Sequence, residues 1–304
     1  MKANNKISLL ILIIFSISLN SVAVAAESSE RFGVIFITHG SSKADHNETV
    51  VKLKERIAAA PEPNQSLTGL EVAFLGDNNT GTMANALKKF SDKNTKNILL
   101  IPISPCSYIR HEEIKTLAEK VGNGVFQFKL APAMDDNPLA VEIIKEHAKA
   151  LSRDPGRENL ILLAAGPVEE MENIVWMRQL ERMGKTICSE MGFQEVACAT
   201  IRNHSPDLIA EQSIIDLRVK AKALKEKGRV IVVPYIFQDG PYEDLQSYLS
   251  GIVPPGDISQ LGFISHLNAD KWVKEVIKKG MDDQPQVKPV NKNWSTKGGD
   301  RSHF

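Results

Sequence analysis

Two histidines follow apolar segments of the kind that form buried β-strands. His39 comes directly after the run 34–38 (VIFIT) and begins the motif His-Gly-Ser-Ser, and His111 follows the run 97–103 (NILLIPI) after a short polar stretch. Neutral imidazoles bind divalent first-row metals and exchange protons near neutral pH, and Glu112 adds a carboxylate. These three residues form a candidate metal or proton-transfer site if the fold brings them together.

Each motif also has a plainer interpretation. The segment 38–42 (THGSS) reads equally well as a helix cap that carries a solvent-exposed histidine. The segment 111–113 (HEE) reads as a solvated first helical turn, where acidic side chains suit the helix dipole. The position of each motif relative to the strands therefore decides between the interpretations.

The chain from residue 31 to 280 alternates short apolar runs with helical stretches. The runs are rich in β-branched residues, are bounded by Gly, Pro or Asn, and lack strict alternation, which favours parallel strands covered on both faces. They are 34–38, 70–75, 97–103, 125–131, 159–165, 195–201, 229–237 and 261–265. Helical periodicity marks 45–59, 170–191 and 206–227. This alternation predicts an α/β fold with parallel sheets.

The eight expected strands divide into two sets of four that resemble each other. FITHGSS (36–42) corresponds to LLAAGPV (162–168), and LLIPISP (99–105) corresponds to IVVPYIF (231–237). We therefore expect a tandem duplication, with one lobe at 31–152 and a second at 157–281, each a four-stranded parallel sheet flanked by helices, with a cleft between them. Ligands of parallel α/β sheets bind beyond the carboxyl ends of the strands, so His39 and His111 would meet at a common cleft.

The two ends of the chain have other characters. Residues 1–26 carry Lys2 and Lys6, an apolar run at 7–19 and a small-residue stretch, which is typical of a signal peptide; an uncleaved N-terminal anchor is the alternative. We expect an exported protein, periplasmic or otherwise extracytoplasmic, that touches the membrane only if the signal is retained. The polar tail 282–304 is predicted to be disordered.

The overall composition narrows the class of protein. The chain has 304 residues with 37 basic and 37 acidic side chains, and loss of the two lysines in residues 1–26 leaves a net charge of −2. A nucleic-acid-binding surface normally needs a basic excess, so we expect no nucleic-acid partner. The 42% hydrophobic content excludes wholesale disorder and a polytopic membrane protein. Three cysteines allow at most one disulfide, for which Cys188–Cys198 is conceivable, and none has zinc-site spacing.

An ordered set of motifs resembles the class II tetrapyrrole chelatases. These are the CbiX/SirB group, which inserts cobalt or iron into sirohydrochlorin. The resemblance rests on FGVIFITHGSS, IPISPCSYIRHEEI, LLAAGP, VVPYIFQDGPYEDL and GFISHLNADKW, and it covers roughly residues 31–280. Family members have two similar four-stranded lobes with a cleft between them, as the duplication predicts.

The resemblance implies an active pair, His39 and His111, that holds the metal and accepts the pyrrole protons. It implies that Glu112, or less favourably Glu113, orients His111 or joins the metal. The metal is a substrate, with Co²⁺ favoured over Fe²⁺ and Ni²⁺, and no organic cofactor is expected. Because sirohydrochlorin carries many carboxylates, the cleft should offer hydroxyls and cations. The candidates are Ser41, Ser42, Ser107 and Arg110, with Lys43, Arg178 and Arg202 as weaker ones.

The chain departs from the family pattern in several places. Ala165 stands where His39 stands in the first half, and Tyr242 or Glu243 stands where His111 stands. The family's glutamate after the second strand is replaced by a segment containing Asp77. His204 and His266 follow expected strands and are either cleft residues or packed ones, whereas His46 and His147 are expected to be solvated on helices.

These departures keep three functions open. The first is an exported chelatase of a sirohydrochlorin-like tetrapyrrole in the biosynthesis of tetrapyrroles such as cobalamin. The second is a periplasmic carrier of metal, haem or a tetrapyrrole that lacks catalysis, suggested by the export signal. The third is a non-catalytic scaffold, because a fold alone carries no function. The oligomeric state is left open.

Overall fold

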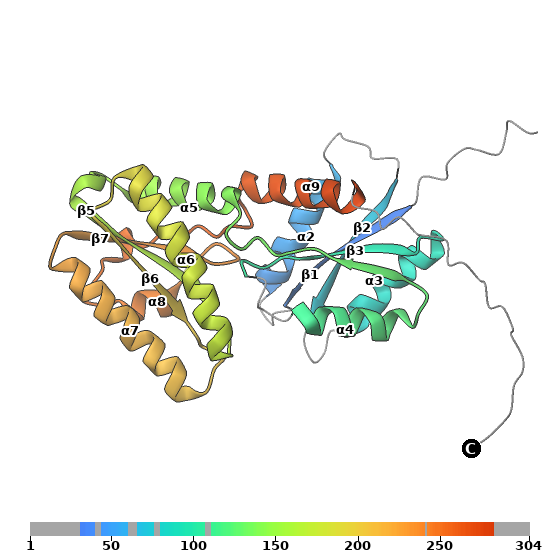
Figure 1. Ribbon diagram of the computed structural model, residues 1–304, viewed down its shortest axis with the longest axis horizontal. Helices are drawn as coiled ribbons and strands as arrows, with labels where there is room; N and C mark the ends of the chain where they lie inside the picture. Colours follow the sequence, from blue (N-terminus) through green and yellow to red (C-terminus); the bar gives the residue numbers. More distant parts are fainter. Residues whose placement is uncertain are drawn as a thin grey trace, which may run out of the picture.

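The computed structural model describes residues 31–39, 44–59, 66–75, 80–106, 111–240 and 242–282, which form two parallel sheets (Figure 1). The predicted signal peptide and residues 283–304 lie outside these ranges. The first sheet has the order β2-β1-β3-β4, with strands β1 (Phe32–His39), β2 (Leu67–Leu75), β3 (Asn97–Pro102) and β4 (Gln127–Leu130). The second has the order β6-β5-β7, with strands β5 (Glu158–Ala165), β6 (Glu195–Ile201) and β7 (Arg229–Tyr235).

Helices cover both sheets, so the predicted α/β class is confirmed. They are α2 (Ala44–Ala58), α3 (Thr80–Asp92), α4 (His111–Gly122), α5 (Pro138–Leu151), α6 (Glu170–Met191), α7 (Asp207–Lys225), α8 (Glu243–Tyr248) and α9 (Leu267–Asp282). Local chemistry sets the ends: Asn137 caps α5 through the Leu139 amide, and Gly192, at a φ of 80°, ends α6. Within the described residues, no helix is long and apolar enough to cross a membrane.

The second sheet has three described strands where the sequence predicted four. The run 261–265 is coiled, with residues 262–264 buried and both ends exposed, and the consecutive residues Phe263 and Ile264 donate to the carbonyls of Ile236 and Phe237. A strand would point alternate residues toward its neighbour. At this edge of the sheet, β7 is paired through an isolated β-bridge between Val232 and Ile258.

The possible disulfide is also absent, since no two of the three cysteines, all of which lie in the described part of the chain, are bonded to each other. The Cys188 thiol donates to the Phe193 carbonyl and the Cys198 thiol to the Leu180 carbonyl. Cys106 is fully buried in the core.

The last helix of each half packs on the sheet of the other half (Figure 1). Helix α5 comes from the first half but lies against β7 and α6, whereas α9 comes from the end of the chain and lies against α2 and β3. The predicted boundary at residues 152–157 lies between α5 and β5, but the halves are interleaved on both sides of it. One apolar core cluster therefore runs from the first sheet through α5 and α9 to the second.

The carboxyl ends of the two sheets converge at this junction. Tyr235 ends β7 and is buried, and its hydroxyl donates to the carbonyl of Asp135 in the loop after β4, at 3.1 Å. The Tyr235 ring packs against Trp176 and Phe263, at centroid distances of 6.0 and 5.7 Å. Burial raises the pKa of Tyr235 well above 10, so its hydroxyl stays a donor. Loops from both sheets are thus fixed to each other beside the expected cleft.

Candidate functional site

The backbone places His39 and His111 at the same edge of the first sheet. His39 is the last residue of β1 and pairs with Leu75 of β2, and His111 is the first residue of α4. Strands β1 and β3 are neighbours, and the amide of Ile103 donates to the carbonyl of Ile37 at 2.7 Å. The chain leaving β3 therefore passes the end of β1 before it enters the loop that leads to His111.

Most of the side chains predicted to form the site lie outside the described residues. Ser41, Ser42, Ser107 and Arg110 are outside altogether, as are Lys43 and Asp77, and of His39, His111 and Glu112 the backbone alone is described. Glu113 is exposed. Among the side chains that are described, no group of three or more His, Cys, Asp or Glu residues is placed to hold a metal ion.

The start of the loop between β3 and α4 is firmly held. The Ser104 hydroxyl donates to the Cys106 carbonyl at 3.0 Å and accepts from the Cys106 amide, and the Ser104 carbonyl accepts from the Met134 amide at 3.2 Å. Residues 104–106 thus pack against the loop after β4.

The second sheet carries different residues at the corresponding positions. Ala165 ends β5 as His39 ends β1, and Glu243 begins α8 as His111 begins α4. Tyr242, the other residue expected at the position equivalent to His111, donates its hydroxyl to the Gln238 carbonyl, and burial raises its pKa. The histidine pair therefore belongs to the first sheet.

The other histidines have distinct environments. His204 is exposed in the loop after β6. His266 caps α9, since its Nδ1 accepts from the Asn268 amide at 3.1 Å, and its Nε2 lies 2.9 Å from Glu146. His147 was predicted to be solvated, but its exposed fraction is only 3%, and its ring lies against that of His266. The prediction is wrong because α5, which carries His147, packs between α9 and the second sheet.

Arg202 is unsuited to the substrate carboxylates for which the sequence made it a candidate. Its guanidinium is buried and donates to the carbonyls of Pro167 and Val168 and to Glu170. It thereby fixes the turn between β5 and α6. A Cβ on Gly166 would lie 2.7 Å from the Arg202 Cγ, so glycine is required at this point of the turn. Arg178, the other described candidate, is exposed on α6.

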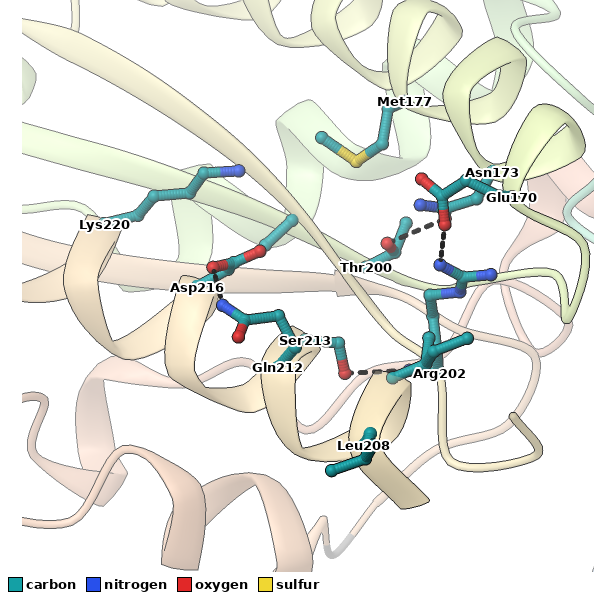
Figure 2. Close-up of a pocket in the computed structure, with 12 residues that line it drawn as sticks. Glu170, Asn173, Met177, Thr200, Arg202, Leu208, Gln212, Ser213, Asp216 and Lys220 are labelled. Atoms are coloured by element: carbon teal, nitrogen blue, oxygen red, sulfur yellow. Dashed lines mark hydrogen bonds and ion pairs between the residues drawn. The ribbon is translucent and has the colours of Figure 1, made fainter. Parts of the chain in front are cut away.

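A hollow of about 450 Å³ lies between α6 and α7 along β6 (Figure 2). Thr200 is at its floor and donates to Asn173, while Gln212 donates to Asp216 on the α7 side. The remaining lining residues are Glu170, Met177, Ala199, Arg202, Leu208, Ile209, Ser213 and Lys220. The sequence did not predict this hollow, because it depends on β6 being an edge strand and strand order is not visible in an apolar run.

Comparison with known proteins identifies the first half. Residues 33–151 match the CbiX family model. This part of the chain is therefore similar to the CbiX family. It comprises the first sheet with α2, α3 and α4, together with α5, and its range includes His39 and His111.

Solved structures share the fold over most of the chain, including much of the half beyond the segment that matches the CbiX family model. The sirohydrochlorin chelatase SirB from Bacillus subtilis subspecies spizizenii, in complex with cobalt, matches with a TM-score of 0.60 and 10% identity, over 83% of this chain and 96% of that one. SirB from Bacillus subtilis with Fe³⁺ matches with a TM-score of 0.62 and 12% identity, and the match covers 83% of this chain and 96% of that one. CbiX, the terminal enzyme for the biosynthesis of siroheme in denitrifying bacteria, matches with a TM-score of 0.55 and 16% identity. The match covers 81% of this chain and 98% of that one. No curated protein matches the sequence.

Proposed function

We propose that the protein is a metal chelatase that inserts a divalent ion into sirohydrochlorin or a closely related tetrapyrrole. The observation that carries the proposal is the backbone position of His39 at the end of β1 and of His111 at the start of the helix after β3, inside the segment that matches the CbiX family model. Support comes from the shared fold with SirB and CbiX, whose structures include complexes with cobalt and iron.

The chemistry asks for groups that bind a cation and accept protons. Insertion replaces two pyrrole N–H bonds with metal–nitrogen bonds and releases two protons, with no change of oxidation state. Neutral imidazoles at His39 and His111 hold the incoming metal and take up those protons. Glu112 hydrogen-bonds His111 and stabilises its protonated form, as carboxylates beside metal-binding histidines do. Cobalt is our first choice of metal, followed by iron and nickel.

The substrate's carboxylates need partners around the same edge of the sheet. Ser41 and Ser42 follow His39, and Ser107 and Arg110 precede His111, so all four belong to the loops at the carboxyl edge of the first sheet. Hydroxyls donate single hydrogen bonds, and a guanidinium binds a carboxylate through two. Arg110 is the anchor we favour, because it adjoins His111.

A spectrophotometric assay without oxygen tests the proposal. The protein starting at Glu27 is mixed with sirohydrochlorin and, separately, with Co²⁺, Fe²⁺ or Ni²⁺, and the absorbance change on metal insertion is followed. His39→Ala and His111→Ala are compared with His204→Ala, a matched control in which an exposed histidine of the second half is removed. We expect insertion faster than the protein-free rate, lost in the first two variants and retained in the control.

The same assay separates the enzyme from a carrier. The predicted signal peptide favours a carrier as the second candidate, since it would place the protein outside the cytoplasm. Tight tetrapyrrole binding without faster insertion would establish the carrier and contradict the chelatase. We also propose that the protein is exported; the mass of the N-terminal peptide from a periplasmic extract should correspond to cleavage after Ala25 or Ala26.

A further inference from the structure

Strand β6 is an edge strand, and the hollow in Figure 2 lies beside it. The Gly166 amide donates to the Ile201 carbonyl, so Ile201 and alternate residues before it point toward β5. Thr200 and Cys198 therefore point their N–H and C=O groups away from the sheet. The Cys198 carbonyl accepts from Lys220 at 2.8 Å, which agrees with this direction. Thr200 and Ala199 line the hollow.

The first sheet shows how such an edge is closed. There β2 is the edge strand, and Phe74 holds the position that Thr200 holds in β6, one residue before the strand's last pair. The Thr82 hydroxyl accepts from the Phe74 amide and donates to the Phe74 carbonyl, at 2.9 and 3.1 Å. Lys93 caps the Thr68 carbonyl. The outward N–H and C=O of Phe74 and the carbonyl of Thr68 are thus used within the protein.

The equivalent groups of β6 are left open. Among the described residues, no side chain bonds the main chain of Thr200, whose hydroxyl is directed to Asn173 instead. An open sheet edge is a ready template for an added strand, and natural proteins normally cover it. The hollow beside Thr200 has about 450 Å³, within the range of ligand-binding pockets.

The walls of this groove indicate what kind of strand would fit. Met177, Leu208 and Ile209 give it apolar contacts, and Leu208 is 81% exposed. Segments 169–177 and 203–217, which form the walls near the end of β6, contain no Lys or Arg. They contain six acids, namely Glu169, Glu170, Glu172, Asp207, Glu211 and Asp216, of which Glu170 and Asp216 line the hollow. Both cations that line it are already engaged, Arg202 with Glu170 and two carbonyls and Lys220 with the Cys198 carbonyl.

We propose that the groove along β6 binds an extended, basic segment of a partner protein, which adds to the second sheet as a further strand. Its main chain pairs with the N–H and C=O of Thr200, alternate side chains contact Met177 and Leu208, and a Lys or Arg lies near Asp216. This is recognition by strand addition, in which main-chain bonds supply affinity and alternate side chains supply specificity. The described residues that line the hollow all belong to β6, α6, α7 and the adjoining turn, and none belongs to the first sheet, so the proposal stands whether or not the protein is a chelatase.

Substitutions at Thr200 isolate the main-chain bond. Thr200→Pro removes the outward N–H but no bond to β5, and proline is tolerated on an edge strand in that orientation. Thr200→Val keeps the N–H and the side-chain shape and is the matched control. Asp216→Lys reverses the charge at the α7 wall. Thermal unfolding of each variant shows whether the fold is retained.

The probe is a library of phage-displayed random dodecapeptides, selected on the immobilised full-length protein. A selected peptide is then synthesised in two further forms, N-methylated at odd or at even amides. We expect basic peptides, whose affinity falls about tenfold with Thr200→Pro, as for one lost hydrogen bond, and changes little with Thr200→Val. One N-methylated form should lose binding and the other keep it, because a strand pairs through alternate residues.

Three results would overturn the proposal. The first is that no selected peptide prefers the parent protein to Thr200→Pro. The second is equal binding of both N-methylated forms, which needs no folded variant and so remains decisive if Thr200→Pro unfolds. The third is that a synthetic peptide of residues 283–304 competes for the groove with the same alternation, which would assign it to the chain's own terminus. Loss of affinity with Asp216→Lys, weaker at high salt, would support the basic partner.

Discussion

Arg56 of α2 and Asp270 of α9 form a two-point ion pair between the beginning and the end of the chain. The guanidinium donates from Nη2 to one carboxylate oxygen at 2.8 Å and from Nε to the other at 3.0 Å, and Nη2 also reaches the Ile264 carbonyl at 2.8 Å. The Asp270 side chain is 13% exposed. The pair fixes α9 on the first sheet and, through Ile264, the turn that leads into α9.

Removing this pair should weaken the fold more than removing an ordinary surface pair. We expect Arg56→Ala to lower the free energy of unfolding by about 1–2 kcal/mol, because Asp270 would lose a charged partner while remaining largely buried. Lys52→Ala, which breaks the exposed Glu48–Lys52 pair, is the control and should cost about 0.5 kcal/mol or less. Urea unfolding measures both. If both variants lose the same free energy of unfolding, the Arg56–Asp270 pair contributes no more to stability than an exposed surface pair.

Gly262 is required by the coiled segment that replaces the predicted fourth strand. A Cβ at this position would lie 2.2 Å from the carbonyl carbon of Gln238, which is main chain and cannot move aside. We expect Gly262→Ala to destabilise the protein by about 1–3 kcal/mol, the usual cost of overpacking. Gly256→Ala is the control, since its Cβ would meet no atom within 4 Å. A similar melting temperature for both variants would contradict the tight crossing.

The sequence predicted the strands better than their arrangement. The run 195–201 is β6 residue for residue, because β-branched residues between polar ones suit a pleated, half-buried surface. The run 261–265 has the same apolar character, but a coil buries Phe263 and Ile264 as well as a strand would. Periodicity likewise predicts an apolar face on α5 without saying which sheet that face covers.

The candidate site shows the same limit. Strand ends are visible in the sequence, so the edge shared by His39 and His111 was predictable from it. The commitment of Arg202 to carbonyls 34 and 35 residues away was not, because it depends on tertiary contacts. His147 is a different case. It lies three or four residues from the buried Ile143 and Ile144, and this spacing on one helical face indicated burial.

The buried His147 makes stability depend on pH. Burial lowers its pKa from 6.5 to about 4, with the charge of His266 adding to the shift and Asp239 and Glu146 opposing it. Because the unfolded chain takes up this proton at higher pH, the contribution is complete above pH 6.5 and is lost as the pH falls to about 4. The loss should approach about 3 kcal/mol.

His147→Leu tests this dependence. The buried Nδ1 has no hydrogen-bond partner among the described residues, so leucine sacrifices no bond there and should be tolerated at pH 7. Urea unfolding of both proteins at pH 7 and pH 4 should show that the parent loses about 3 kcal/mol more than the variant. Parallel losses in the two proteins would mean that other groups control acid sensitivity.

The cysteines should differ in reactivity. Burial raises the pKa of Cys198 to about 12, and Cys106 is fully buried, whereas Cys188 is partly exposed with a smaller upward shift. Since the thiolate is the reactive form, iodoacetamide should label Cys188 first and the other two only on unfolding. Peptide mass spectrometry after timed labelling measures this order. A mass that shows Cys188 joined to Cys198 would contradict the free thiols.

The two neighbouring glutamates at the start of α4 should contribute unequally to metal insertion. In the proposed mechanism Glu112 supports the charged form of His111, and Glu113 is exposed on the same helical turn. We expect Glu112→Gln to lower kcat by about 10- to 100-fold, the usual cost of removing a carboxylate that supports a metal-binding histidine. Glu113→Gln changes charge equally at a neighbouring position and should have a much smaller effect. If Glu113→Gln proves the more damaging, the supporting carboxylate is Glu113. If neither matters, His111 works without a carboxylate partner.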